Sequence, residues 1–138
     1  MRNIIALFFS FTFIIVQSQS FDLNIKIKNI KQTKGTLELV VYNNANTFLE
    51  KGEAVKRYSI LATSTIKSFT IKNLPKGSYA IAVYHDVNSD KRCNTNLVGI
   101  PVEPYGFSRN YKPVFSKPSF DDCMINIEKS MSIDIALL

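Results

Sequence analysis

Short runs in which hydrophobic and polar residues alternate make up most of the chain after residue 20. The first run, residues 23–28, reads LNIKIK, and a period of two places its apolar side chains on one face of a strand. Comparable runs predict six further strands, over residues 36–42, 58–62, 66–71, 79–84, 120–127 and 131–138. Seven short strands without a convincing amphipathic helix predict an all-β fold, an antiparallel sandwich like that of immunoglobulin domains.

The same period predicts which side chains form the core. They are Ile25, Ile27, Leu39, Val41, Phe69, Ile81, Val83, Ile125, Ile127, Ile133 and Ile135. Residues 79–84 are apolar on both faces, which is typical of a strand in the middle of a sheet.

The N-terminus has the pattern of a secretory signal peptide. Arg2 precedes an apolar run over residues 4–16, and the QSQS that follows offers cleavage after Ser18 or Ser20. The run is short for a membrane span, although a retained anchor is the alternative. We therefore expect a signal peptide over residues 1–20 and one domain over 21–138. The protein is expected to be exported to the periplasm or the medium, without a stable membrane span once the signal is removed.

The formal net charge of +6 is spread along the chain. In the first strand, Lys26 and Lys28 alternate with Ile25 and Ile27, so they form the solvated face of a sheet. A nucleic-acid surface would need clustered basic residues with interleaved aromatic ones. The sequence therefore predicts no nucleic-acid binding.

A long segment from residue 85 to 110 interrupts the strand pattern and is rich in Asp, Asn, Gly and Pro. A loop of this length in a small domain is usually functional. Asp86, Asn88, Asp90 and Asn94 take relative positions 1, 3, 5 and 9, with the Arg92 carbonyl at position 7. Oxygens at this spacing curve around one centre in calcium loops, so the segment is a candidate Ca²⁺ site.

Two residues depart from that calcium pattern. Leu97 stands at position 12 in place of a bidentate Glu, and Lys91 stands where a glycine permits a sharp turn. The alternative is a loop whose Asp and Asn side chains bond their own backbone. If the site binds Ca²⁺, Asp86→Asn should abolish stabilisation by the ion, with little change in the calcium-free fold.

Catalysis is the competing functional class. His85, Asp86 and Glu103 are the candidate centre of a small hydrolase. No nucleophile motif accompanies them, and His85 is the one histidine of the chain. The sequence therefore favours a non-catalytic binding or accessory module.

Aromatic residues follow in the same segment. Tyr105 and Phe107, with His85 and Glu103, are predicted to form the surface of the loop. Exposed, the aromatic rings would make a platform for a sugar ring or a partner protein, and buried they would close one end of the sandwich. The expected partner is thus an unidentified protein or carbohydrate.

Four motifs follow one another along the chain: LPxGxYAxAV from Leu74, HDxNxD from His85, GIPxExYGFS from Gly99 and PSFDD from Pro118. Together they resemble the DUF2141 family, secreted bacterial proteins of uncharacterised function. The resemblance implies a transthyretin-like β-sandwich and no established activity.

The chain has two cysteines, Cys93 and Cys123, at positions where that family usually has an apolar and a small residue. An even pair in an exported chain is more often bridged than free, so a Cys93–Cys123 disulfide is expected. Zinc ligation is a weaker alternative, since two thiols and His85 leave such a site one ligand short.

Overall fold

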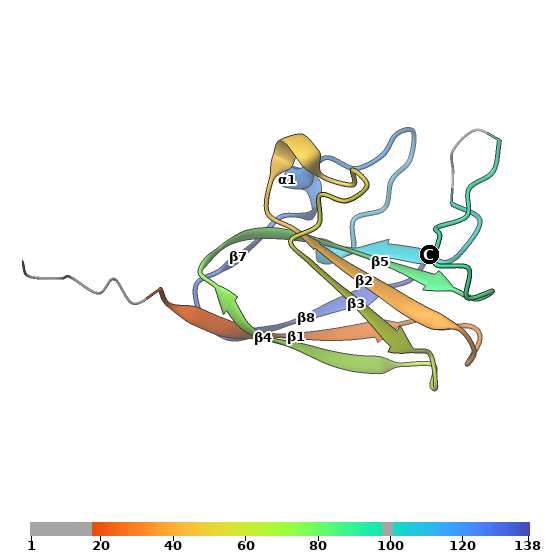
Figure 1. Ribbon diagram of the computed structural model, residues 1–138, viewed down its shortest axis with the longest axis horizontal. Helices are drawn as coiled ribbons and strands as arrows, with labels where there is room; N and C mark the ends of the chain where they lie inside the picture. Colours follow the sequence, from red (N-terminus) through yellow and green to blue (C-terminus); the bar gives the residue numbers. More distant parts are fainter. Residues whose placement is uncertain (1–17, 98–100) are drawn as a thin grey trace, which may run out of the picture.

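The computed structural model describes residues 18–97 and 101–138, which form two packed β-sheets (Figure 1). Most of the predicted signal peptide, residues 1–17, and Gly99 and Ile100 of the family motif lie outside the described residues. The small sheet has the order β4-β1-β8, from Lys67–Pro75, Ser20–Lys28 and Met131–Ala136. The large sheet has the order β3-β2-β5-β6, from Lys56–Leu61, Thr36–Tyr42, Gly77–Asp86 and Tyr105–Phe107, and β7 (Ile125–Ile127) also pairs with β5.

The predicted core lies between the two sheets. Each residue predicted for it belongs to one inner cluster or packs against that cluster, so the period-two prediction is confirmed. Fully buried members such as Leu39, Ile81 and Ile135 come from both sheets. Burying an aliphatic side chain of this kind contributes about 1.5–3 kcal/mol, which makes this cluster the main source of stability.

One strand pair differs from the antiparallel expectation. β1 pairs with β4 in antiparallel fashion but with β8 in parallel, with Ile25 opposite Phe69 on one side and Ile133 on the other. The chain reaches β8 from β7, which belongs to the large sheet. It therefore crosses between sheets before β8 instead of turning back beside β1, and a crossover allows parallel pairing.

The prediction of a central strand over residues 79–84 is confirmed by β5, which pairs with β2 on one side and with β6 and β7 on the other. Its inward side chains join the core, while Ala80 faces a second buried cluster outside the large sheet. There Phe48 makes edge contacts with Tyr42 at 5.3 Å and with Phe120 at 5.9 Å between ring centroids.

Two predicted elements are corrected. The expected strand over 120–127 is a helical turn, α1 (Phe120–Cys123), followed by the short β7, because Ser119 and Asp122 cap each other's backbone and start a helix. The expected loop around residue 106 contains β6. The described part of the chain therefore has eight strands, one more than predicted.

Gly106 holds β6 against the small sheet. A Cβ at this position would lie 2.8 Å from the Ala136 carbonyl oxygen, so a side chain does not fit. The N–H of Leu138 donates to the Tyr105 carbonyl at 2.8 Å, which joins the edges of the two sheets. This close approach turns Tyr105 and Phe107 toward the outer face of the large sheet.

Two short 3-10 turns, η1 (Ala45–Thr47) and η2 (Ser108–Asn110), complete the described elements. Within the ranges 18–97 and 101–138, no helix has the length and apolar character needed to cross a membrane.

Candidate functional site

The loop that follows β5 is organised by Asp86, whose side chain is fully buried. One carboxylate oxygen accepts the backbone N–H of Asp90 at 3.1 Å, and the other accepts that of Lys91 at 2.7 Å. Asp86 therefore caps the turn that leads out of the strand. Its negative charge is compensated by backbone donors, and charge-assisted bonds of this kind are the stronger ones.

Glu103, on the returning arm of the loop, also accepts hydrogen bonds from backbone N–H groups. It is 8% exposed, and its two oxygens accept the backbone N–H groups of Val87 at 3.1 Å and Asn94 at 3.2 Å. A single side chain thus joins the outgoing and returning arms.

The exposed Asp90 is the third carboxylate that accepts hydrogen bonds within the loop. Its oxygens accept the amide groups of Asn88 at 3.0 Å and Asn94 at 2.9 Å, and the backbone N–H of Arg92 at 2.8 Å. The hydrogen bond from Asn94 is the largest of the causes that hold the pKa of Asp90 below its usual range. The candidate calcium ligands are therefore brought together, but their polar atoms bond one another.

These contacts bear on the calcium hypothesis. Both oxygens of Asp86 are engaged by the backbone. Asn88 and Asn94 donate their amide groups to the Asp90 carboxylate, and the Asn88 side-chain oxygen accepts the Asp90 backbone N–H at 3.2 Å. Among the residues that the structure describes, no group of three or more His, Cys, Asp or Glu is placed to hold a metal ion. The arrangement is that of the self-bonded loop, and calcium binding stays an untested hypothesis.

His85 lies inside the sandwich, not on the loop surface. It is fully buried, its Nε2 lies 2.7 Å from the Lys34 carbonyl oxygen, and its Nδ1 has no hydrogen-bond partner. Strand alternation turns His85 to the inner face and Asp86 to the outer face. The predicted surface of His85, Glu103, Tyr105 and Phe107 is thus corrected, since His85, Glu103 and Phe107 are buried and both aromatic residues belong to β6.

The predicted Cys93–Cys123 disulfide is not formed in this structure, in which both thiols are free. Ser108 binds both the Cys123 carbonyl and the backbone of Ile81, so Cys123 lies beside the middle of β5. Cys93 lies instead near Tyr84, three residues further along the strand.

A groove of about 1120 Å³ lies over the outer face of the large sheet. Its floor consists of side chains that alternate with the core residues of β2 and β5 and of the two aromatic residues of β6. These floor residues are Val40, Tyr42, Ala82, Tyr84, Tyr105 and Phe107. Tyr84 and Tyr105 are half-buried, so their rings stay accessible from the groove.

Three loops form the walls of this groove. The groove is lined by residues 49–51, by 90–93 with 95 and 101, and by 113–118, and the loops that carry them rise on the same side of the large sheet (Figure 1). Val114 and Phe115 on the third loop are 79% and 100% exposed. An unpacked phenylalanine at the rim of a groove is available for contact with a ligand.

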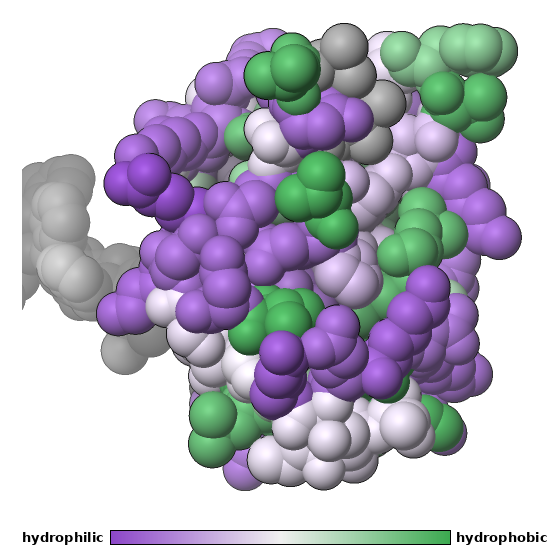
Figure 2. Space-filling view, turned by 90° about the vertical axis from the view of Figure 1, so that its right-hand side faces the viewer, coloured by the Kyte–Doolittle hydropathy of each residue, from purple (hydrophilic) through white to green (hydrophobic). Residues whose placement is uncertain are grey.

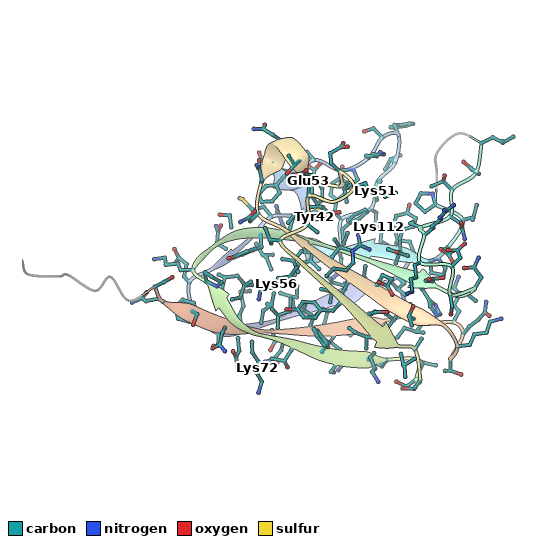
Figure 3. The ribbon with its side chains drawn as sticks, viewed as in Figure 1. Tyr42, Lys51, Glu53, Lys56, Lys72 and Lys112 are labelled. Carbon is teal, nitrogen blue, oxygen red and sulfur yellow. The ribbon has the colours of Figure 1, made fainter. Side chains whose placement is uncertain are left out.

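The groove is basic. Its lining has five basic side chains and two acidic ones, namely Lys51, Arg57, Lys91, Arg92 and Lys117 against Glu50 and Asp90. Figure 3 shows Lys51 on the loop side of the molecule, near Tyr42, and Lys72 on the side of the small sheet. The positive charge therefore lies on the same side as the accessible aromatic rings.

Arg57 and Tyr84 interact on the floor. Burial raises the pKa of the Tyr84 hydroxyl and the charge of Glu38 adds to the rise, while Arg57 opposes it by its charge and a hydrogen bond. Glu38 is 6% exposed and accepts hydrogen bonds from Thr36, at 3.0 Å, and from Ser59. Tyr84 is consequently a neutral hydroxyl at physiological pH, with Arg57 held beside it.

The groove was not predicted from the sequence. The available signal was the outward half of the alternation in β5, where Ala82 and Tyr84 make an apolar face, together with Val114 and Phe115 between two prolines. Neither signal says that the loops meet around that face.

A family model described as "Uncharacterized protein conserved in bacteria (DUF2141)" matches residues 25–134. The chain belongs to the DUF2141 family. The match confirms the resemblance seen in the sequence motifs and covers strands of both sheets, together with the self-bonded loop. No curated protein and no solved structure matches this DUF2141 chain.

Proposed function

We propose that this DUF2141 protein is an exported, non-catalytic binding module whose ligand occupies the groove over the outer face of the large sheet. The observation that carries the proposal is the groove itself, with its accessible rings and basic walls. Concave sites with an apolar floor and a few polar groups are the usual places of ligand binding. The transthyretin-like architecture implied by the family resemblance is part of the same proposal.

The self-bonded loop supports this role by shaping one wall. Asp86 and Glu103 hold the loop from inside, and this leaves Lys91, Arg92 and Cys93 along the groove. A rigid wall reduces the entropy lost when a ligand binds. The loop therefore acts as a preorganised rim in this proposal.

The residues predicted as the centre of a hydrolase do not lie in the groove. Neither His85 nor Glu103 lines the groove, and strand alternation places His85 on the same face of β5 as the core residue Val83. A general base must reach a substrate proton. The groove thus supports binding without a part for these residues in catalysis.

Export is proposed on the signal pattern and on the start of the fold. The N–H of Lys76 donates to the Gln19 carbonyl at 2.9 Å, and Ser20 is the first residue of β1. Cleavage after Ser18 keeps both residues, whereas cleavage after Ser20 removes them. Intact-mass analysis of the processed protein should therefore give Gln19 as the first residue, and a full-length mass would contradict export.

The binding role can be tested by filling the groove. Thermal shift should be measured with neutral and acidic oligosaccharides, acidic and basic peptides, and oligonucleotides as probes. Any probe that stabilises the natural protein should lose its effect in Ala82→Phe, which places a ring on the floor. Ser68→Phe, on an exposed position of β4, is the matched control and should leave binding unchanged. Stabilisation by no probe, or equal stabilisation of both variants, would contradict the proposal.

A further inference from the structure

The floor of the groove offers a ligand side chains instead of backbone groups. β2 is paired along its length with both β3 and β5, and β5 is paired in turn with β6. A peptide that binds as an added strand needs an unpaired sheet edge. Recognition over this floor therefore depends on rings, hydroxyls and charges.

The accessible rings suit a ligand with flat apolar faces and hydroxyl edges. Tyr84 and Tyr105 present half-buried rings on the floor, and Phe115 presents a fully exposed ring on the wall. Tyrosine combines an apolar ring with a polar hydroxyl, so it contacts both faces and edges of such a ligand. Sugar rings have this character, since their C–H faces stack on aromatic rings and their hydroxyls hydrogen-bond.

The positive charge of the groove walls favours acidic sugars over neutral ones. In the described part of the chain, the ion pairs are Lys28–Asp134 and Lys76–Glu128, so the five basic groups of the groove are not engaged by carboxylates in ion pairs. Of the two acidic side chains in the groove, Asp90 accepts three hydrogen bonds from the loop. The groove therefore presents an excess of available positive charge, which attracts anionic ligands.

Resting on the proposed groove-binding function, we infer that this DUF2141 protein binds an acidic oligosaccharide, a short chain of sugar rings that carry carboxylate or sulfate groups. The sugar faces stack on Tyr84, Tyr105 and Phe115, and the anionic groups pair with Arg57, Lys51 and the basic residues of the 90–95 wall. A volume of about 1120 Å³ accommodates several rings, since pockets for drug-sized ligands are about 300–1000 Å³.

The test compares two probes that share one sugar chain, with the carboxylates charged in one and esterified in the other. Calorimetric titration of the processed protein should show binding of oligogalacturonate and much weaker binding of the same oligosaccharide after full methyl esterification. Binding should weaken as salt is raised to about 0.5 M, because exposed charges are screened over a few ångströms at high ionic strength. A sulfated oligosaccharide serves as a second acidic probe.

Substitutions of groove residues test whether the oligosaccharide binds in the groove. Lys51→Gln and Arg57→Gln should each weaken binding about threefold, as expected for an exposed ion pair. Phe115→Ala should weaken it about fivefold, as expected for a ring contact. Lys72→Gln, the same change on the opposite side of the molecule, should have no effect (Figure 3). All four positions are exposed or half-exposed, so the variants should fold.

The outcomes distinguish binding of an acidic oligosaccharide from the proposed function, which is binding of any ligand in the groove. Equal binding of the charged and esterified sugars, or equal effects of Lys51→Gln and Lys72→Gln, would overturn the inference. Binding of an acidic peptide or an oligonucleotide in the groove, with no binding of either acidic sugar, would also overturn it and leave the proposed function standing. The proposed function falls if no probe stabilises the protein, or if Ala82→Phe and Ser68→Phe are stabilised equally.

Discussion

The carboxylate of Asp86 accepts the backbone N–H of Lys91 at 2.7 Å, from a side chain that has no exposed surface. Five residues apart in the sequence, the two are joined by the turn that starts the groove wall. The same carboxylate accepts the N–H of Asp90, so one buried group satisfies two backbone donors.

Asp86→Asn should therefore destabilise the protein by about 1–3 kcal/mol, because the amide nitrogen would face a backbone N–H that loses its acceptor. This differs from the expectation of a solvated carboxylate that contributes little. Urea denaturation measures the effect, and Asp90→Asn, at an exposed position of the same loop, should cost less. Equal stability of Asp86→Asn and the natural protein would show that the cap is unimportant.

Addition of about 10 mM Ca²⁺, a concentration suited to weak extracellular sites, should leave the melting temperature unchanged. The reason is that the oxygens of Asp86 and Asp90 are already engaged by donors within the loop. Differential scanning calorimetry with Mg²⁺ as a control checks this. A rise of a few degrees with Ca²⁺ alone would establish the calcium site instead.

Lys91→Gly should stabilise the fold. Lys91 has φ 61°, in the left-handed region that costs a residue with a side chain about 1–2 kcal/mol. Glycine removes that strain but loses more entropy on folding, so a net gain of about 0.5 kcal/mol is expected. Denaturation with Lys26→Gly as the comparison, in the middle of β1, should show the opposite sign, and a destabilised Lys91→Gly would contradict this account.

The two thiols should differ in reactivity. Cys93 is exposed, whereas Cys123 is fully buried. Burial raises the pKa of both thiols, and that of Cys123 rises to about 12. Since the thiolate is the reactive form, alkylation at pH 8 should modify Cys93 in the folded protein and Cys123 only after unfolding. Peptide mapping by mass spectrometry checks the sites. Recovery of a Cys93–Cys123 bridged peptide without reductant would contradict the structure.

The cap of α1 should depend on pH. Hydrogen bonds from the Ser119 backbone and side chain hold the pKa of Asp122 below its ordinary value of 3.8. A lowered pKa in the folded state means that the stabilisation is present above pH 3.8 and is lost as the pH falls through the folded value. The melting temperatures of Asp122→Asn and the natural protein should therefore differ most at neutral pH and converge in acid. A constant difference would rule out this cap.

The end of the molecule that carries the loop after β5 exposes both hydrophobic and hydrophilic side chains (Figure 2). Figure 2, which faces this end, shows hydrophobic patches separated by hydrophilic side chains. The described surface there is not one continuous apolar face of the kind that buries a large partner.

The alternation of residues such as Ile25, Ile27 and Ile81 was enough to predict the sandwich and its core, because successive side chains of a strand point to opposite faces and the apolar face packs on the core. The family motifs and the Asp and Asn spacing also placed the loop. Only the tertiary structure decided that Asp86 and Glu103 would be buried caps, since their donors depend on how the loop folds back.

The groove, too, was beyond the sequence. Its floor joins Tyr84 of β5 to Tyr105 of β6, and its walls join Lys51, Arg92 and Phe115 from three separate loops. Such residues meet because strands pair over long distances in the chain and because β6 is held against β8 by the close approach of Gly106. Local patterns determine which face of each strand is apolar, whereas the pairing of strands determines which side chains share one surface.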